Sequence, residues 1–216
     1  MVFFNLLSRQ YETALMLVNH NRYARSLFYQ LAVRKFSNMT QIDLVYPVST
    51  WTMMRNAMDT VEGSWLDEGC DKDNICTGLV MLLRNKSAML NEYFRISIDQ
   101  SNNLVGLPDL LNGYNPVSSE LPFFIWRLAT ETDWDDELSC FTGICMELAT
   151  LYSTLPIFSD NASKIESIVS SVFFPAFKSY LIPTKSAENF NTDTTILSDM
   201  LHVTSLEKLY SVFERC

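Results

Sequence analysis

The sequence predicts a mixed α+β fold. Two pairs of short apolar runs are joined by polar turns, residues 2–7 with 13–18 and residues 94–98 with 104–105, and each pair is typical of a β-hairpin. Longer segments carry apolar residues every three or four positions, which indicates amphipathic helices. Because hairpins and helices do not alternate regularly along the chain, α+β is favoured over a doubly wound parallel sheet.

Start and stop signals organise the first quarter of the chain. The stretch Asn19-His20-Asn21 is expected to cap a helix that extends to about Ser37, and Thr50 is expected to cap a second helix. Between these helices, residues 41–48 alternate between apolar and polar side chains. The alternation, with Pro47 near the end, predicts an edge strand.

The middle of the chain combines a loop, a helix and a strand. Residues 62–73 are rich in acids and contain two glycines, which predicts a solvated loop. A long helix is expected to begin at Asp73 or Asn74. The dense apolar run 121–129 predicts a buried strand, and Asp133 with Asp136 predicts the capped start of the next helix.

One proline conflicts with the helical pattern near residue 175. Ile165, Ile168, Val169 and Val172 have helical spacing, yet Pro175 follows within the same pattern. Proline removes one backbone hydrogen bond and clashes with the carbonyl four residues earlier. We therefore expect the helix to kink or break before it.

The composition excludes several classes of protein. The 216 residues carry a net charge of -9, whereas a domain that grips DNA phosphates by itself should be basic. No apolar run approaches the ~18 residues that a membrane-spanning helix needs. The first apolar run, residues 2–7, is too short for a secretory signal, so an intracellular protein is predicted.

The potential metal ligands and thiols show no recognisable catalytic spacing. His20 and His202 have no cysteine or carboxylate partner at meaningful spacing, so structural roles are favoured. Cys140 and Cys145 fit small core residues, although a regulatory thiol function is an alternative. Four acids are close together in the sequence and could suggest a metal site: Asp133, Asp135, Asp136 and Glu137. We expect them instead to line different sides of the first turn of a helix, where the helix dipole favours negative charge.

The last eleven residues combine an apolar helical face with a terminal cysteine. Leu206, Leu209, Tyr210 and Phe213 have helical spacing, and Thr204 with Glu207 has the form of a capping box. Cys216 carries a thiol and the α-carboxylate on one residue. A soft sulfur beside a hard oxygen can ligate a transition metal once the thiol has lost its proton.

Several blocks in this order resemble the C-terminal domain of the eukaryotic MutL homologue 1 family of DNA mismatch repair proteins. These blocks are Leu27-Phe-Tyr-Gln30, Asn103-Leu-Val-Gly-Leu-Pro108, the stretch from Leu121 to Glu137, and Phe213-Glu-Arg-Cys216. The resemblance implies a mixed sheet with flanking helices, divided into a dimerisation subdomain and an inserted external subdomain. The expected boundaries are 1–46 and 116–216 for the former and 47–115 for the latter.

The resemblance also implies that this chain does not cut DNA alone. Catalytic paralogues of the family carry a D-Q-H-A-x-x-E-x-x-x-x-E motif, and matching its preceding strand to Leu17-Val18 aligns the ligand positions with Asn19, Asn21, Arg25 and Gln30. Amides bind divalent metals weakly and arginine does not bind them. A stand-alone metal-dependent nuclease or hydrolase that uses His20, Asn21 and nearby acids is the alternative.

For the tail, the resemblance implies a role in another subunit. Cys216 is expected to ligate Zn or Mn in the endonuclease site of a MutL paralogue, and this chain alone is expected to hold no cofactor. Phe213 would anchor the tail, while Glu214 and Arg215 would fix its path.

Further partners follow from the same resemblance. The family's heterodimer forms in the nucleus and binds peptides of an exonuclease and other repair factors, with DNA bound only through the full complex. The family's ATPase half is expected to lie outside this chain, and a generic protein-interaction module remains an alternative. Candidate interface residues come from two apolar segments that fit a core equally well: Phe123, Ile125, Leu128, Phe173 and Phe177.

Overall fold

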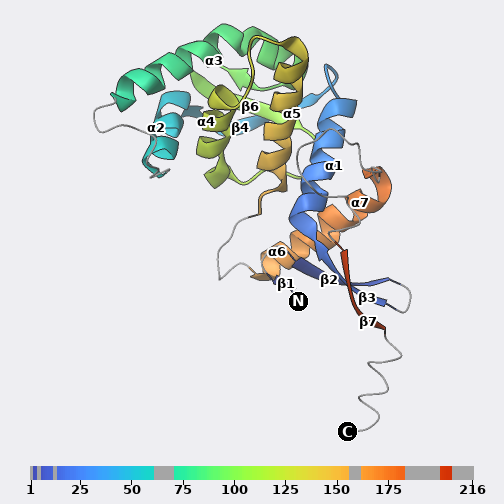
Figure 1. Cartoon of the computed structure of the whole chain (residues 1–216). Helices are drawn as coiled ribbons and strands as arrows, with labels where there is room; N and C mark the ends of the chain where they lie inside the picture. Colours follow the sequence, from blue (N-terminus) through green and yellow to red (C-terminus); the bar gives the residue numbers. More distant parts are fainter. Residues whose placement is uncertain are drawn as a thin grey trace. The chain divides into compact units, whose positions relative to one another are not determined.

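The computed structural model describes residues 2–3, 6–11, 14–60, 71–155, 162–182 and 200–205 (Figure 1). The chain divides into two compact units, one made of Met1–Leu27 with Leu155–Cys216 and the other of Phe28–Thr154. Both chain ends therefore belong to one unit and the middle to the other. These boundaries differ from the expected ones at 46/47 and 115/116, and the roles of the units in dimerisation stay a prediction.

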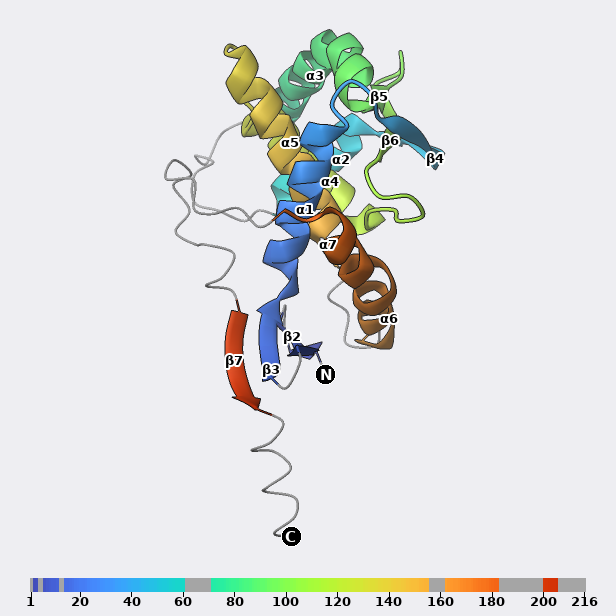
Figure 2. The same cartoon turned by 90° about the vertical axis from the view of Figure 1, so that its right-hand side faces the viewer.

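A four-stranded antiparallel sheet belongs to the unit of the chain ends. Its order is β1 (Val2–Phe3), β2 (Leu6–Tyr11), β3 (Ala14–Asn19) and β7 (Met200–Ser205). The β2–β3 pairing confirms the first predicted hairpin. β7 lies beside β3 in Figures 1 and 2 and places His202 opposite Met16, although the sequence around His202 predicts only a short connector.

The helix after β3 begins where its cap was predicted. α1 (His20–Arg34) follows Asn19, whose Oδ1 accepts a hydrogen bond from the Arg22 amide at 3.3 Å. Such a bond satisfies one of the amides that have no partner in the first turn. The cap predicted within residues 19–21 is confirmed and falls on Asn19, while the helix ends at Arg34 and not near Ser37.

The proline at 175 is accommodated by a wider helical turn. α6 (Ala162–Ile168) leads into the π-helical turn η3 (Val169–Phe173), and α7 (Phe174–Tyr180) follows with Pro175 in its first turn. The Phe174 amide bonds to the carbonyl of Val169, five residues earlier. The α-helical bonding is thus interrupted immediately before the proline, which is the form that the expected break takes.

The Phe28–Thr154 unit contains a second, three-stranded antiparallel sheet. Its order is β4 (Thr40–Ser49), β6 (Asn103–Asp109) and β5 (Ser97–Ile98), which confirms both the edge position of β4 and the second hairpin. The helices around it are α2 (Thr50–Thr60), α3 (Lys72–Phe94), α4 (Leu121–Thr130) and α5 (Glu137–Ser153), with a short 3-10 turn η1 (Ser118–Glu120) before α4. α4 packs against α2, α3 and α5, and Figure 1 shows α3 running along the sheet.

Side-chain caps correct two of the predicted helix starts. Ser49, rather than Thr50, caps α2, because its Oγ accepts from the Thr52 amide at 3.3 Å. Asp71 caps α3 through its Oδ1, so that helix begins at Lys72 and not at Asp73 or Asn74. The capped start predicted for α5 from Asp133 and Asp136 is confirmed, and the capping residue is Asp136, which accepts from the Ser139 amide at 2.8 Å.

The longest apolar run of this unit is a helix, which overturns the prediction of a strand at 121–129. Six residues of α4 are buried: Leu121, Phe124, Ile125, Trp126, Leu128 and Ala129. A run that is apolar on nearly all sides has no helical period to recognise. Pro122 in the first turn was the available signal, because its fixed φ suits a helix start.

The end of α3 also differs from the prediction. The helix extends to Phe94 and ends at Arg95, whose φ of 54° lies in the left-handed region. Residues Ser97–Ile98 alone form β5, so the strand expected over 94–98 is shorter. The left-handed residue closes the helix and lets the chain turn into the sheet.

Two aromatic clusters stabilise this unit, one of them buried in its core and the other buried only at Phe94. The Phe28 ring is 5.6 Å from the ring of Tyr114 and 5.4 Å from that of Tyr152. Tyr152 donates its hydroxyl hydrogen bond to the carbonyl of Pro108, and Tyr114 donates to the carbonyl of Tyr152 at 3.1 Å. Burial raises the pKa of both phenols. The second cluster comprises Phe36, Tyr93, Phe94 and Phe141.

A partly buried ion pair joins α4 to α5, and we expect its two halves to be strongly coupled. Arg127 Nε lies 2.7 Å from Glu147 Oε2, with side chains 34% and 12% exposed. Arg127→Met should lower the free energy of unfolding by about 2 kcal/mol, because a nearly buried carboxylate loses its counter-charge while the exposed part of Arg127 weakens the effect. Urea denaturation of Arg127→Met, Glu147→Met and the double variant measures the coupling. Additive losses would contradict it.

Candidate functional site

The positions aligned with the endonuclease ligands begin at the junction of β3 and α1. Asn19 uses its side chain to cap α1, while Asn21 is half-buried and Arg25 is exposed on the helix. A capping amide already has a hydrogen-bond donor, and the guanidinium adds positive charge to this helix face. These three residues therefore offer no carboxylate or imidazole to a cation.

The fourth aligned position lies farther along the same helix. Gln30 accepts a hydrogen bond from Arg34 Nη2 at 3.0 Å through its Oε1. This contact between residues four apart is a common arrangement on a helix surface. Its amide oxygen is thus engaged with a cation of the chain itself.

His20 is the only buried histidine in the part of the chain whose side chains are described. Its side chain is 3% exposed, and its Nδ1 has no hydrogen-bond partner. Burial lowers the pKa of His20, which favours the neutral ring at neutral pH. A general base needs an orienting group and substrate access, and the described residues provide neither at this ring.

Of the four acids expected to line the first turn of a helix, only Glu137 does so, because α5 begins there, and the acids before it form turn and capping contacts. Asp133 accepts from the Asp135 amide at 3.0 Å, and Asp136 caps the helix. The hydrogen bond from Ser139 holds the pKa of Asp136 below its usual value. Within the described ranges, no three His, Cys, Asp or Glu residues are placed to share a metal ion.

The candidate interface residues divide by burial. Ile125, Leu128 and Phe173 are 0% exposed within this chain, so their side chains build its core. Phe123 and Phe177 are half-buried and keep accessible surface. Phe177 also packs against Tyr23, with ring centroids 6.0 Å apart.

Two exposed apolar residues at the end of α7 were missed in the sequence. Tyr180 is 48% exposed and Ile182 59% exposed. Single exposed apolar side chains are common on protein surfaces, but these two lie close together in sequence beyond Phe177. The sequence does not predict that Tyr180 and Ile182 are exposed, because their exposure depends on where α7 ends.

The tail residues expected to act in a partner lie outside the described residues. The last described element is β7, which ends at Ser205, and the tail follows it with Phe213, Glu214, Arg215 and Cys216. The helix expected from Leu206 also lies outside the described residues. Thr204, expected to cap that helix, is part of β7.

The three cysteines whose surroundings are described are expected to react slowly with thiol reagents. Cys76, Cys140 and Cys145 are buried, and burial raises the pKa of Cys145 to about 11. The reactive form is the thiolate, so these residues should be modified slowly at pH 8 in the native chain and rapidly in urea. Mass spectrometry after timed alkylation measures the modification of each cysteine. Rapid modification of Cys140 or Cys145 in the native chain would contradict this expectation and favour the regulatory thiol function.

Comparison with known proteins decides the family. The family model described as "DNA mismatch repair protein Mlh1 C-terminus" matches residues 4–216. The chain belongs to the Mlh1 C-terminal family. The resemblance predicted from the sequence blocks is therefore confirmed, and the mixed α+β fold agrees with it.

Curated relatives of the Mlh1 family cover nearly the whole chain. DNA mismatch repair protein Mlh1 of Dictyostelium discoideum is 31% identical over 231 residues, and that of Saccharomyces cerevisiae is 31% identical over 233 residues. The putative MutL protein homolog 1 of Schizosaccharomyces pombe is 30% identical over 214 residues. Each alignment covers 96% of this chain but only 25%, 28% and 29% of the relative, respectively.

The described helices include none that is both long and apolar enough to cross a bilayer. α3, the longest of them with 23 residues, carries several charged side chains along its length.

Proposed function

We propose that this chain is the heterodimerisation part of a nuclear DNA mismatch repair subunit. It pairs with a catalytic MutL paralogue, supplies Cys216 to the partner's endonuclease metal site and docks peptides of an exonuclease and other repair factors. The chain itself is non-catalytic, and DNA binding belongs to the full complex. The family match that extends to residue 216 is the observation that carries this proposal.

The residues of α1 support the non-catalytic assignment. Three amide side chains and one guanidinium stand at the four aligned ligand positions, and two of the amides already make hydrogen bonds within the chain. A site that must hold two or more divalent ions needs carboxylate and imidazole ligands. The metal is therefore expected in the partner, where the sulfur and carboxylate of Cys216 add ligands of both soft and hard character.

Co-purification with a MutL paralogue tests the proposed assembly. The tagged chain should retain the paralogue's C-terminal domain through gel filtration, and a chain shortened by residues 206–216 should show whether the tail contributes to assembly. A single chain that elutes alone at micromolar concentration would contradict the heterodimer.

A titration of the lone chain with Mn²⁺ separates this proposal from the stand-alone nuclease. The proposal expects no saturable Mn²⁺ binding and no nicking of supercoiled plasmid by the chain alone. Saturable binding that is lost in His20→Ala would favour the enzyme, because that alternative places His20 in its site.

A further inference from the structure

The outer edge of β4 is open and irregular. β4 is the first strand in the order β4–β6–β5, so one of its sides has no strand neighbour within the described part of this unit. Its pairing with β6 breaks between Asp43, opposite Gly106, and Val48, opposite Leu104. An unpaired edge can accept an added strand, while the irregularity and Pro47 limit the length that can pair.

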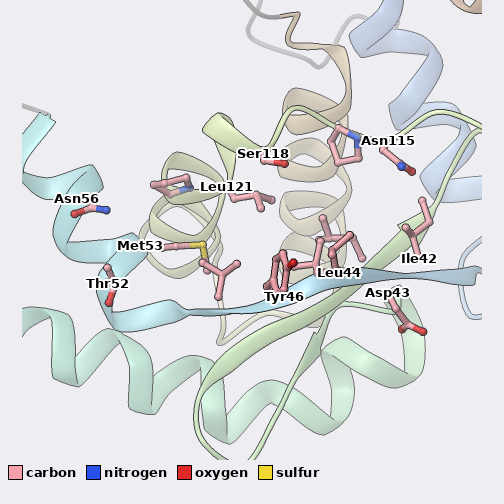
Figure 3. A pocket seen from close by; sticks show the side chains of 15 residues that line it. Ile42, Asp43, Leu44, Tyr46, Thr52, Met53, Asn56, Asn115, Ser118 and Leu121 are labelled. Atoms are coloured by element: carbon pink, nitrogen blue, oxygen red, sulfur yellow. The ribbon is translucent and has the colours of Figure 1, made fainter.

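A pocket of about 400 Å³ lies beside this edge (Figure 3). Ile42, Leu44 and Tyr46 of β4 project to the side of the strand on which Leu121 lies, and Met53 of α2 lines the same space. This volume and a mostly apolar lining with a few amides and hydroxyls are typical of ligand pockets. The pocket is built entirely from the Phe28–Thr154 unit.

Two consecutive apolar residues on this edge are strongly exposed. Val45 is 86% exposed and Tyr46 is 78% exposed, the two highest values among the exposed large apolar side chains of the described residues. Both residues are among those that line the pocket. Neighbouring exposed apolar side chains beside an apolar hollow mark a surface that gains free energy when covered.

Charge distinguishes the kind of segment that would cover it. Asp43 is the one charged residue that lines the pocket, and the described residues form no ion pair with it. It projects to the opposite side of β4 from Leu44 (Figure 3). Neighbouring residues of an added strand also point to opposite sides, so an apolar residue in the pocket and a basic residue beside Asp43 would be adjacent in sequence.

We propose that the edge of β4 and the pocket beside it bind a short extended peptide with an apolar residue next to a lysine or arginine. The proposal rests on the docking role proposed above and names its surface, but it does not involve the tail or the metal site. A short peptide suits the edge better than a second copy of this chain, because the irregular pairing and Pro47 prevent a long strand-to-strand contact.

Binding of defined peptides by the full chain tests this inference. The probe is a fluorescein-labelled peptide of about eight residues with alternating Lys and Leu, the length of an ordinary strand. Matched peptides carry Ser in place of Leu or Glu in place of Lys, and fluorescence anisotropy measures the dissociation constants. The Lys–Leu peptide should bind at least about tenfold more tightly than either, because each lacks one of the two proposed contacts.

Variants of the edge separate this site from general attraction to an acidic chain. Asp43→Lys should weaken binding of the Lys–Leu peptide about tenfold, and the exposed double change Val45→Ser/Tyr46→Ser should weaken it similarly. Glu92→Lys is the matched control, since Glu92 is an exposed acid of α3 with the same change in charge, and it should leave binding within about twofold. Circular dichroism verifies that each variant is folded.

Three outcomes would overturn the β4 site. The first is equal binding of the Lys–Ser and Lys–Leu peptides, and the second is equal loss in Asp43→Lys and Glu92→Lys. The third is a change of sedimentation of the free chain in the edge variants, which would assign the edge to a second copy. Repair-factor peptides that bind all variants equally would overturn this site while leaving the proposed docking role intact.

Discussion

Replacement of Phe28 by alanine is expected to lower the free energy of unfolding of the Phe28–Thr154 unit by roughly 3–5 kcal/mol. The Phe28 side chain is 0% exposed and contacts the rings of Tyr114 and Tyr152. Removing the ring leaves a cavity between groups that are held by hydrogen bonds to the main chain, which limits their collapse. A loss of this size is a large part of the total stability of an ordinary domain.

Urea denaturation followed by tryptophan fluorescence measures this loss. All four tryptophans lie between residues 28 and 154, so their signal reports this unit. Val33→Ala is the matched control, because Val33 lies on the same helix but is 49% exposed. That change should alter the free energy of unfolding by no more than about 0.5 kcal/mol. Equal midpoints for the two variants would show that the Phe28 cluster does not stabilise the unit.

Local signals predicted the elements that depend on neighbouring residues. The β2–β3 hairpin follows from two apolar runs joined by a short polar turn, and α5 follows from a carboxylate that caps the amide three residues ahead. In both cases the stabilising contact lies within a few residues of the signal. The same holds for Asn19 at the start of α1.

Elements that depend on distant contacts could not be predicted in this way. α4 was interpreted as a strand because a run buried on most sides shows no period. β7 becomes a strand through pairing with β3, about 185 residues earlier in the chain, and the sequence around His202 carries no turn signal for it. The pocket beside β4 likewise combines residues from three separate segments.

The candidate site shows the same division. The substituted ligand positions of α1 were recognisable because a motif with fixed spacing defines them, and the structure adds that Asn19 and Gln30 have hydrogen bonds of their own. The burial of Ile125, Leu128 and Phe173 was not recognisable, because a core and an obligate interface use the same apolar residues. Phe123 and Phe177 are therefore the better positions at which to probe dimerisation.

Loss of the terminal sulfur is expected to abolish nicking by the heterodimer while leaving assembly unchanged. Changes beside a metal ligand already cost about 10–100-fold in affinity or activity, so removal of a ligand should cost at least as much. Cys216→Ser keeps the shape of the side chain but replaces a thiol by a hydroxyl that does not ionise near neutral pH. We therefore expect nicking of supercoiled plasmid with Mn²⁺ to fall to background in this variant.

A further variant separates the sulfur from the docking of the tail. Phe213→Ala should lower nicking by the heterodimer, because the tail loses an apolar contact with the partner while the metal ligand Cys216 is kept. Zinc and manganese content of the purified heterodimer, measured by mass spectrometry, should fall for Cys216→Ser and fall less for Phe213→Ala, which keeps the ligand but docks it less firmly. If Cys216→Ser kept full metal content and full nicking activity, Cys216 would not be a ligand in the partner's metal site, and the proposed role of the tail would be wrong.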